Sequence, residues 1–299
     1  MYFNFYLTRK ILNLLCIVAA SLTSLVIFLI VLSPKPMSTD AHSDDSVELP
    51  VLMYHGLIKN PKHQNRFMIS PDFFEKDLQY INDNGYTTIF VQDLIDYVYN
   101  DVPLPSKPIM ITFDDGYFNN YLYAFPLIKK YNCKIVLSPI GKSTDDYSKI
   151  VDEHADYSHV TWNHIREMTE SGLVEIQNHT YNMHSNKKSR IGCSKKKGES
   201  LDEYKKELGE DIMKMQERVT SEIGKTPSAF VFPFGAISKE APTIIRDMGF
   251  KCTFCCEGRL NKITKNQDCL YCLCRFIRPN SIDTKQYFRK ILKVKPRQK

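Results

Sequence analysis

The sequence predicts an α/β domain of alternating strands and helices, preceded by one membrane-spanning segment. From Leu49 onward, short apolar runs alternate with amphipathic stretches, which is typical of βα units rather than of a β-sandwich. Several of these runs end in an ionisable residue, the position where parallel barrels carry their chemistry. Before them, residues 11–32 carry no charge and are long enough for a bilayer core that takes about 20 helical residues.

The composition supports a folded domain. The 299 residues are 43% hydrophobic and 25% charged, which gives enough apolar mass for one large domain or two small ones. The 12 Gly and 15 Pro are spread along the chain without a short repeat, so collagen, coiled-coil and low-complexity classes are excluded. The net charge of +6 is mild, and we expect no nucleic-acid partner.

Charges around the apolar run predict its orientation. Arg9 and Lys10 precede it and acidic residues follow, which places residues 1–10 in the cytoplasm and 11–32 across the cell membrane as a signal anchor. Residues 33–48 are expected to be a linker, and 49–299 an extracytoplasmic domain. Signal peptides have apolar regions of only about 7 to 15 residues, so a single-pass anchor is favoured over cleavage and secretion. No segment predicts a protein partner.

The alternation can be followed along the chain. Short apolar runs predict strands at 51–55, 87–90, 109–113, 134–138, 174–178, 229–232, 251–255 and 270–276. Stretches with helical spacing predict helices at 71–84, 91–99, 119–130, 162–171, 201–223, 239–248 and 284–292. In the clearest helix, 201–223, apolar residues recur every three or four positions, which indicates a core-facing stripe rather than a ligand site.

Ionisable residues at three strand ends are the candidate site. Asp114 and Asp115 follow the strand 109–113, and Gly116 after them allows a tight turn that swings both carboxylates to one side. His179 and His184 follow the strand 174–178, and His55 ends the first strand. Two His and one Asp suit a catalytic zinc ion, which leaves a position open for water. Taken singly, each motif has a simpler interpretation: Asp114 and Asp115 fit a solvated turn, His179 and His184 a surface pair, and His55 a structural histidine.

A further motif, residues 230–235, is a hydrophobic strand broken by Pro233 and closed by Gly235. It indicates either a simple strand end with a turn or the wall of a substrate groove, in which an aromatic ring and a backbone amide face the reacting group.

Taken in this order, the segments resemble the polysaccharide deacetylases of the NodB type, carbohydrate esterase family 4, over about residues 49–279. The resemblance is greatest to poly-β-1,6-N-acetylglucosamine N-deacetylases, which begin with a Val-Leu-x-Tyr-His strand and space their metal-binding histidines five apart, as Val51 to His55 and His179 with His184 do. The resemblance implies a distorted (β/α)7 barrel.

It also implies the roles of the site residues. Asp114 would be the general base, His55 the general acid that a circular permutation of the motifs places on the first strand, and Asp115, His179 and His184 the metal ligands. The implied cofactor is a divalent metal, most simply Zn2+, with Co2+ or Ni2+ as alternatives.

The implied substrate is an N-acetylglucosamine-containing extracellular or cell-wall polysaccharide, as in biofilms, which the enzyme would de-N-acetylate. Expected substrate contacts are Tyr54, Pro233, Phe234 and Gly235. Two alternatives stay open: an esterase for O-acetylated polysaccharide, and an inactive glycan-binding surface protein.

The sequence departs from the family in one respect. Many members have Arg-x-Pro-Tyr, whose Arg orients the base, but here the motif reads Phe-Val-Phe-Pro-Phe-Gly. Arg275 or Arg278 is a candidate substitute.

Cysteines crowd between Cys252 and Cys274. Their spacing fits buried thiols, disulfides in an oxidising compartment or a structural zinc site. The basic loop 187–197 fits an ordinary solvated insertion or a contact with an anionic polymer or lipid surface.

Overall fold

The structure is a computed structural model that describes residues 46–293. The expected cytoplasmic segment, the membrane anchor at 11–32 and most of the linker lie outside the described residues. Within 46–293, no helix combines the length and the apolar character needed to cross a bilayer.

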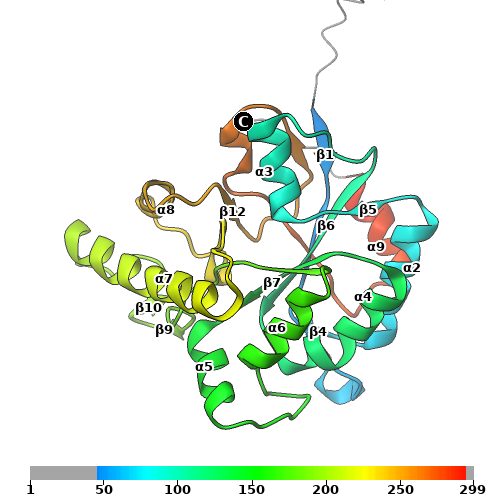
Figure 1. Cartoon of the computed structure of the whole chain (residues 1–299), viewed down its shortest axis with the longest axis horizontal. Coiled ribbons are helices and arrows are strands. Elements are labelled where there is room, and N and C mark those ends of the chain that lie inside the picture. Colours follow the sequence, from blue (N-terminus) through cyan, green and yellow to red (C-terminus); the bar gives the residue numbers. More distant parts are fainter. Residues whose placement is uncertain (1–45, 294–299) are drawn as a thin grey trace, which may run out of the picture. The chain divides into compact units, whose positions relative to one another are not determined.

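The centre of the fold is a parallel sheet (Figure 1). Its strand order is β14 (Phe276–Ile277), β2 (Val51–Tyr54), β6 (Pro108–Asp115), β7 (Ile135–Pro139) and β8 (Val174–Ile176), and β5 (Thr87–Thr88) also pairs with β6. Every residue of β6 is buried, which is typical of a parallel strand covered on both faces.

A second parallel pair, β11 (Ala229–Val231) with β12 (Cys252–Phe254), continues the sheet. A bridge between Asn178 and Phe230 connects the end of β8 to β11, and another between Phe254 and Leu273 connects β12 to the segment that leads into β14. The parallel segments therefore follow one another around a ring, and their carboxyl ends face the same opening.

Helices cover this ring. They are α2 (Pro71–Asp83), α3 (Val91–Asn100), α4 (Phe125–Tyr131), α5 (Gly141–Lys149), α6 (Trp162–Glu170), α7 (Leu201–Ile223), α8 (Ala241–Asp247) and α9 (Thr284–Ile291). Helix α2 contacts both α4 and α9 on one side of the sheet (Figure 1).

Helix α7 shows how the sequence sets these elements. Ser200 caps its first turn by accepting from the Glu203 amide, and Gly224 ends it with a left-handed φ of 69°. Its predicted stripe is buried at Tyr204, Leu208, Ile212, Met215 and Val219, whereas Leu201, on the first turn, is 43% exposed.

Short strands complete the fold. Strand β1 (Val47–Leu49) pairs antiparallel with β13 (Asn261–Ile263), so the folded unit begins two residues before the expected boundary. Two more small pairs are β3 (Gly56–Leu57) with β4 (Met68–Ile69) and β9 (Asn186–Lys187) with β10 (Arg190–Ile191).

The structure differs from the predicted local structure at one strand. The segment 270–276 is not one strand: a 3-10 turn, Gln267–Leu270, and a left-handed Cys272 with φ 60° break it before β14. The predicted helix 119–130 is present, and its first part is a π-turn, Asn120–Ala124, that continues into α4.

Candidate active site

The carboxyl ends of the strands enclose a pocket of about 630 Å³. Six residues named from the sequence line it: His55, Asp114, Asp115, His179, His184 and Phe234. They come from the ends of β2, β6, β8 and β11, so the ring brings together side chains that are far apart in the chain.

The turn after β6 explains why both carboxylates reach this pocket. Asp115 has a left-handed φ of 69°, which rotates it to the same side as Asp114. Gly116 follows with φ 72°, and a Cβ there would lie 2.5 Å from the Pro139 side chain, so the turn requires glycine.

Asp115, His179 and His184 form a cluster that fits a divalent cation. Asp115 Oδ1 lies 3.4 Å from His179 Nε2 and 3.1 Å from His184 Nε2, and one ligand atom from each residue lies within 4.8 Å of the others. Asp115 Oδ1 is buried and has no hydrogen-bond partner in the described part of the chain. Two imidazoles and one carboxylate are ligands that Zn2+ accepts.

Each of the two imidazoles has a neighbour that orients it. His179 Nδ1 donates to the Val231 carbonyl at 2.8 Å, which leaves Nε2 free to face Asp115. The His184 ring lies 4.4 Å from the Phe234 ring. Between the histidines, Thr180 has a φ of 72°, which is rare for a β-branched residue and typical of strain held at a functional site.

Arg275 orients Asp114. Its Nη1 and Nη2 donate to Asp114 Oδ1 and Oδ2 at 2.7 and 2.8 Å, and its Nε donates to the Cys255 carbonyl. Burial alone would raise the pKa of Asp114, but the charges of Arg275 and His179 outweigh it and lower that pKa. Of the two candidates, Arg275 therefore contacts the carboxylate, whereas Arg278 pairs with Asp77 at 2.7 Å.

For Asp115, too, burial opposes ionisation and is outweighed. The neighbouring His179 and His184 imidazoles hold its pKa well below the ordinary value. Both carboxylates are therefore ionised at neutral pH.

His55 faces these carboxylates from β2. Its ring packs edge-on against Phe67 with the centroids 5.0 Å apart, and its Nδ1 is buried without a hydrogen-bond partner among the described residues. Asn120 Nδ2 donates to the His55 carbonyl at 2.7 Å and fixes the backbone. Burial lowers the pKa of His55, although Asp114 and Asp115 act in the opposite direction.

The structure does not bring Tyr54 to the pocket. Tyr54 is 2% exposed, its ring stacks on Phe113 in the core and its hydroxyl donates to Asp77 at 3.0 Å. Successive residues of a strand point to opposite faces, so Met53 and His55 line the pocket while Tyr54 does not. This alternation could have excluded Tyr54 from the sequence alone.

Of the motif Pro233-Phe234-Gly235, only Phe234 lines the pocket. Its ring is 48% exposed, and its φ of 57° turns it toward the opening. Pro233 is buried behind it, and a Cβ on Gly235 would lie 3.0 Å from that of Cys256.

Sequence reasoning missed several lining residues: Arg66, Phe67, Met68, Tyr117, Cys256 and Ile277. The first three lie in or beside β4, in a polar segment without a strand or helix pattern, so no signal marked them. Cys256 was noticed only as part of the cysteine cluster.

The cysteines between 252 and 274 are thiols in the described structure. Cys252 and Cys269 pack in the apolar core, and the Cys255 and Cys274 sulfurs lie 3.9 Å apart, beyond the length of a disulfide bond. Within 46–293, the cluster of Asp115, His179 and His184 is the one group of ligating side chains close enough to share an ion.

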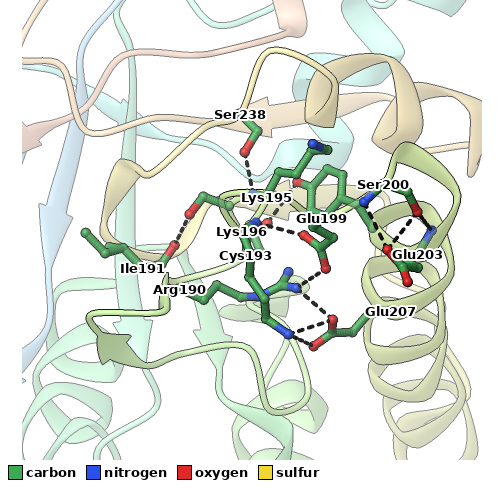
Figure 2. Close-up of polar contacts among 12 residues, drawn as sticks. Arg190, Ile191, Cys193, Lys195, Lys196, Glu199, Ser200, Glu203, Glu207 and Ser238 are labelled. Carbon is green, nitrogen blue, oxygen red and sulfur yellow. Dashed lines mark hydrogen bonds and ion pairs between the residues drawn. The ribbon is translucent and has the colours of Figure 1, made fainter.

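Some basic residues of the loop 187–197 form ion pairs within the protein (Figure 2). Arg190 is buried and pairs with Glu199 at 2.5 Å and Glu207 at 2.7 Å, and Lys196 pairs with Glu207 at 3.1 Å. These pairs attach the loop to helix α7.

The structure is an α/β fold with a ring of parallel strands. At the carboxyl ends of these strands, a carboxylate and two histidines form a candidate metal site beside a second ionised carboxylate. The chain belongs to the polysaccharide deacetylase family, whose model matches residues 101–253. Members of carbohydrate esterase family 4 depend on a metal ion.

Named relatives agree with this family. A poly-beta-1,6-N-acetyl-D-glucosamine N-deacetylase of Escherichia coli K12 is 24% identical over 261 residues, which are 81% of this chain and 38% of the relative. The chain thus spans well under half of that relative. A protein of the same name from Staphylococcus aureus MRSA252 is 21% identical over 214 residues, 70% of this chain and 68% of the relative.

Solved structures share the fold. A de-N-acetylase from Aggregatibacter actinomycetemcomitans superposes with a TM-score of 0.70 at 25% identity, over 82% of this chain and all (100%) of that one. IcaB from Ammonifex degensii superposes with a TM-score of 0.65 at 24% identity, over 82% of this chain and 96% of the IcaB chain.

Proposed function

We propose that this protein removes N-acetyl groups from N-acetylglucosamine units of an extracellular or cell-wall polysaccharide, with Asp114 as the base and His55 as the acid. The observation that carries the proposal is the arrangement of one pocket: an ionised Asp114, held by Arg275, lies beside the cluster of Asp115, His179 and His184. The names of the relatives from Escherichia coli and Staphylococcus aureus support this substrate class.

Asp115, His179 and His184 would hold the divalent ion, Zn2+ first, with Co2+ or Ni2+ as alternatives. When bound, such an ion polarises the acetyl carbonyl and lowers the pKa of a water molecule toward about 7. The remaining chemistry belongs to the side chains and amides of the pocket.

Asp114 would accept the proton of the attacking water. Its lowered pKa keeps it ionised, and the two hydrogen bonds from Arg275 fix its orientation. His55 would donate a proton to the departing amine, after which acetate leaves and a glucosamine unit remains in the polymer.

Attack on the acetyl carbon would place negative charge on the acetyl oxygen, which needs a hydrogen-bond donor aimed at it. In the turn after β11, the Gly235 and Ala236 amides already donate to the Phe232 and Pro233 carbonyls at 3.0 and 3.1 Å. We therefore assign the donor role to the Phe234 amide.

The proposal includes the setting of the domain. The ring of strands is a distorted (β/α)7 barrel, and an uncleaved anchor at 11–32 with the linker that follows holds it at the outer face of the cell membrane. There it would meet a cell-wall or biofilm polysaccharide.

The first test measures acetate released by the full-length protein from N-acetylglucosamine oligomers and from peptidoglycan. We expect release that a chelator abolishes and added Zn2+ or Co2+ restores. O-acetylxylan is the control substrate: release from it alone would favour the esterase, and no release from any substrate by metal-loaded protein would favour the glycan-binding alternative.

A thiol in the pocket gives a second test. Cys256 lines the pocket, with its sulfur 3.8 Å from Arg275 Nη2, and burial raises the pKa of the thiol. We expect a bulky maleimide to react slowly at neutral pH and faster at higher pH. The adduct should lower turnover by roughly 10²-fold, because it displaces the reacting groups.

Cys256→Ser is the matched variant for this test. It should keep its activity and resist the reagent, as followed by mass spectrometry and acetate release. Equal inactivation of the wild type and Cys256→Ser would show that the sulfur does not face the substrate.

A further inference from the structure

A second pocket, of about 540 Å³, adjoins the metal pocket. Arg66 and Ile277 line both pockets, so the two pockets are adjacent. The second pocket lies between the loop 279–282, which follows β14, and helix α9. An extended substrate that enters the metal pocket can therefore continue into the second.

The walls of this pocket are built before any ligand arrives. Arg278, buried beneath the loop, donates to the carbonyls of Pro279 and Ile282 at 2.5 and 2.8 Å, and Asp77 holds its other side. The Tyr287 hydroxyl donates to the Phe276 carbonyl at 3.0 Å, which ties α9 to β14. Because these contacts already fix the walls of the pocket, little conformational entropy is lost when a ligand binds there.

Its lining suits an uncharged sugar. Aromatic and aliphatic side chains provide an apolar wall, while Asn280 and Ser281 provide hydrogen-bonding groups at the rim. Small-molecule sites combine an apolar surface with a few polar groups in this way.

The charges around the pocket select against a cation. Arg66 and Lys290 line it, and no lining residue is acidic. The nearest carboxylates along the chain are already engaged, since Glu257 pairs with Arg259 and Asp283 caps helix α9. A glucosamine unit that has lost its acetyl group carries an ammonium at neutral pH, which these two positive charges repel.

We propose that this second pocket is a flanking subsite that binds a still-acetylated neighbouring sugar of the polysaccharide chain whose N-acetyl group is hydrolysed in the metal pocket. The inference rests on the proposed function. Such a subsite gives the enzyme a preference for long substrates and for sugar units whose neighbour is still acetylated. Deacetylated units should therefore be spaced along the polymer rather than contiguous.

Gly258→Trp tests the subsite by filling it. A Cβ on Gly258 has only the Phe276 ring as a near neighbour, at 3.5 and 3.9 Å, so a side chain can start there without meeting backbone atoms. We expect the wild-type full-length protein to have a kcat/KM that rises with oligomer length. In Gly258→Trp, the ratio of kcat/KM for the hexamer to that for the dimer should fall by about tenfold.

Gly209→Trp is the matched control. Gly209 lies on helix α7, away from both pockets, and a Cβ added there would meet no heavy atom within 4 Å. Its length dependence should equal that of the wild type.

The charge preference is tested with oligomers that carry one glucosamine unit at a defined position, followed by mass spectrometry of the products. The wild type should avoid units next to glucosamine, and Lys290→Glu should reduce that preference several-fold. Lys285→Glu, on the same helix but outside the pocket lining, should not.

The outcomes separate this inference from the proposed function. No acetate from any oligomer would overturn the proposed function itself. Acetate released with equal efficiency at every length, or an unchanged ratio in Gly258→Trp, would overturn the subsite while leaving the deacetylase intact.

Discussion

Asp114→Asn is expected to lower turnover by roughly 10²- to 10⁴-fold, the range for loss of a general base, while the protein keeps its metal. Asparagine has nearly the same shape as aspartate, so its oxygen can still accept a hydrogen bond from Arg275. It cannot take up a proton from water. Asp114 is not among the three clustered ligands, so the metal content after dialysis should equal that of the wild type.

His179→Ala should behave differently. It removes one of the three ligands together with the hydrogen bond to Val231, so both metal and turnover should be lost. His63→Ala is a suitable control, because His63 pairs with Asp156 at the surface and lies outside the pocket. Turnover retained in Asp114→Asn would refute the base assignment, and metal retained in His179→Ala would refute the ligand assignment.

The residues of this site that could be predicted are those whose signal is local. Asp114 and Asp115 adjoin an apolar strand, and His179 follows another, so each position is fixed by a strand end and needs no knowledge of distant packing. Parallel topology then brings the strand ends together.

The partner of Asp114 could not be chosen from the sequence. Arg275 and Arg278 lie three residues apart in one segment, and a regular strand there would have placed them on opposite faces. The backbone there is irregular, with a left-handed Cys272 and a short β14, and the contact of Arg275 with Asp114 spans 161 positions of the chain.

Helix α5 was missed for a different reason. The sequence predicts no helix between 138 and 162, because Gly141–Lys149 has no apolar stripe. The helix instead buries polar groups: Asp145 accepts from Trp162 Nε1 at 2.7 Å and from the Tyr181 hydroxyl at 3.0 Å. A helix held by buried hydrogen bonds leaves no periodic hydrophobic signal.

The second large effect is expected for Arg275→Leu, which leaves Asp114 buried without its partner. Breaking a buried ion pair in this way costs about 3–5 kcal/mol of the free energy of unfolding. Without Arg275, burial becomes dominant and the pKa of Asp114 rises. The acidic limb of the pH–rate profile should therefore move to higher pH.

The pH dependence of stability should change in the same sense. In the wild type the pKa of Asp114 is lowered, so its ionised form stabilises the fold above the unfolded pKa of about 3.9, and this contribution is lost as the pH falls through the folded pKa. In Arg275→Leu the pKa of Asp114 in the folded state is raised. The ionised, unpartnered Asp114 therefore destabilises the fold at neutral pH, and this cost is relieved as Asp114 is protonated at lower pH. Urea unfolding at pH 7 and pH 5 measures the difference.

Arg278→Leu is the matched control, because Arg278 is as deeply buried and also pairs with a buried carboxylate, Asp77. The neighbours of the two carboxylates differ. His179 and His55 face Asp114, whereas Tyr54 and Thr284 contact Asp77. Burial raises the pKa of Asp77 even though Arg278 acts to lower it. Both variants should lose stability. With the shortest oligomer that is turned over as substrate, only Arg275→Leu should shift the acidic limb of the pH–rate profile.

Arg275→Lys keeps the positive charge and loses the paired hydrogen bonds. It should restore the position of the acidic limb and only part of the turnover. Equal pH–rate profiles for the two leucine variants would mean that Arg275 stabilises the fold and does not position Asp114.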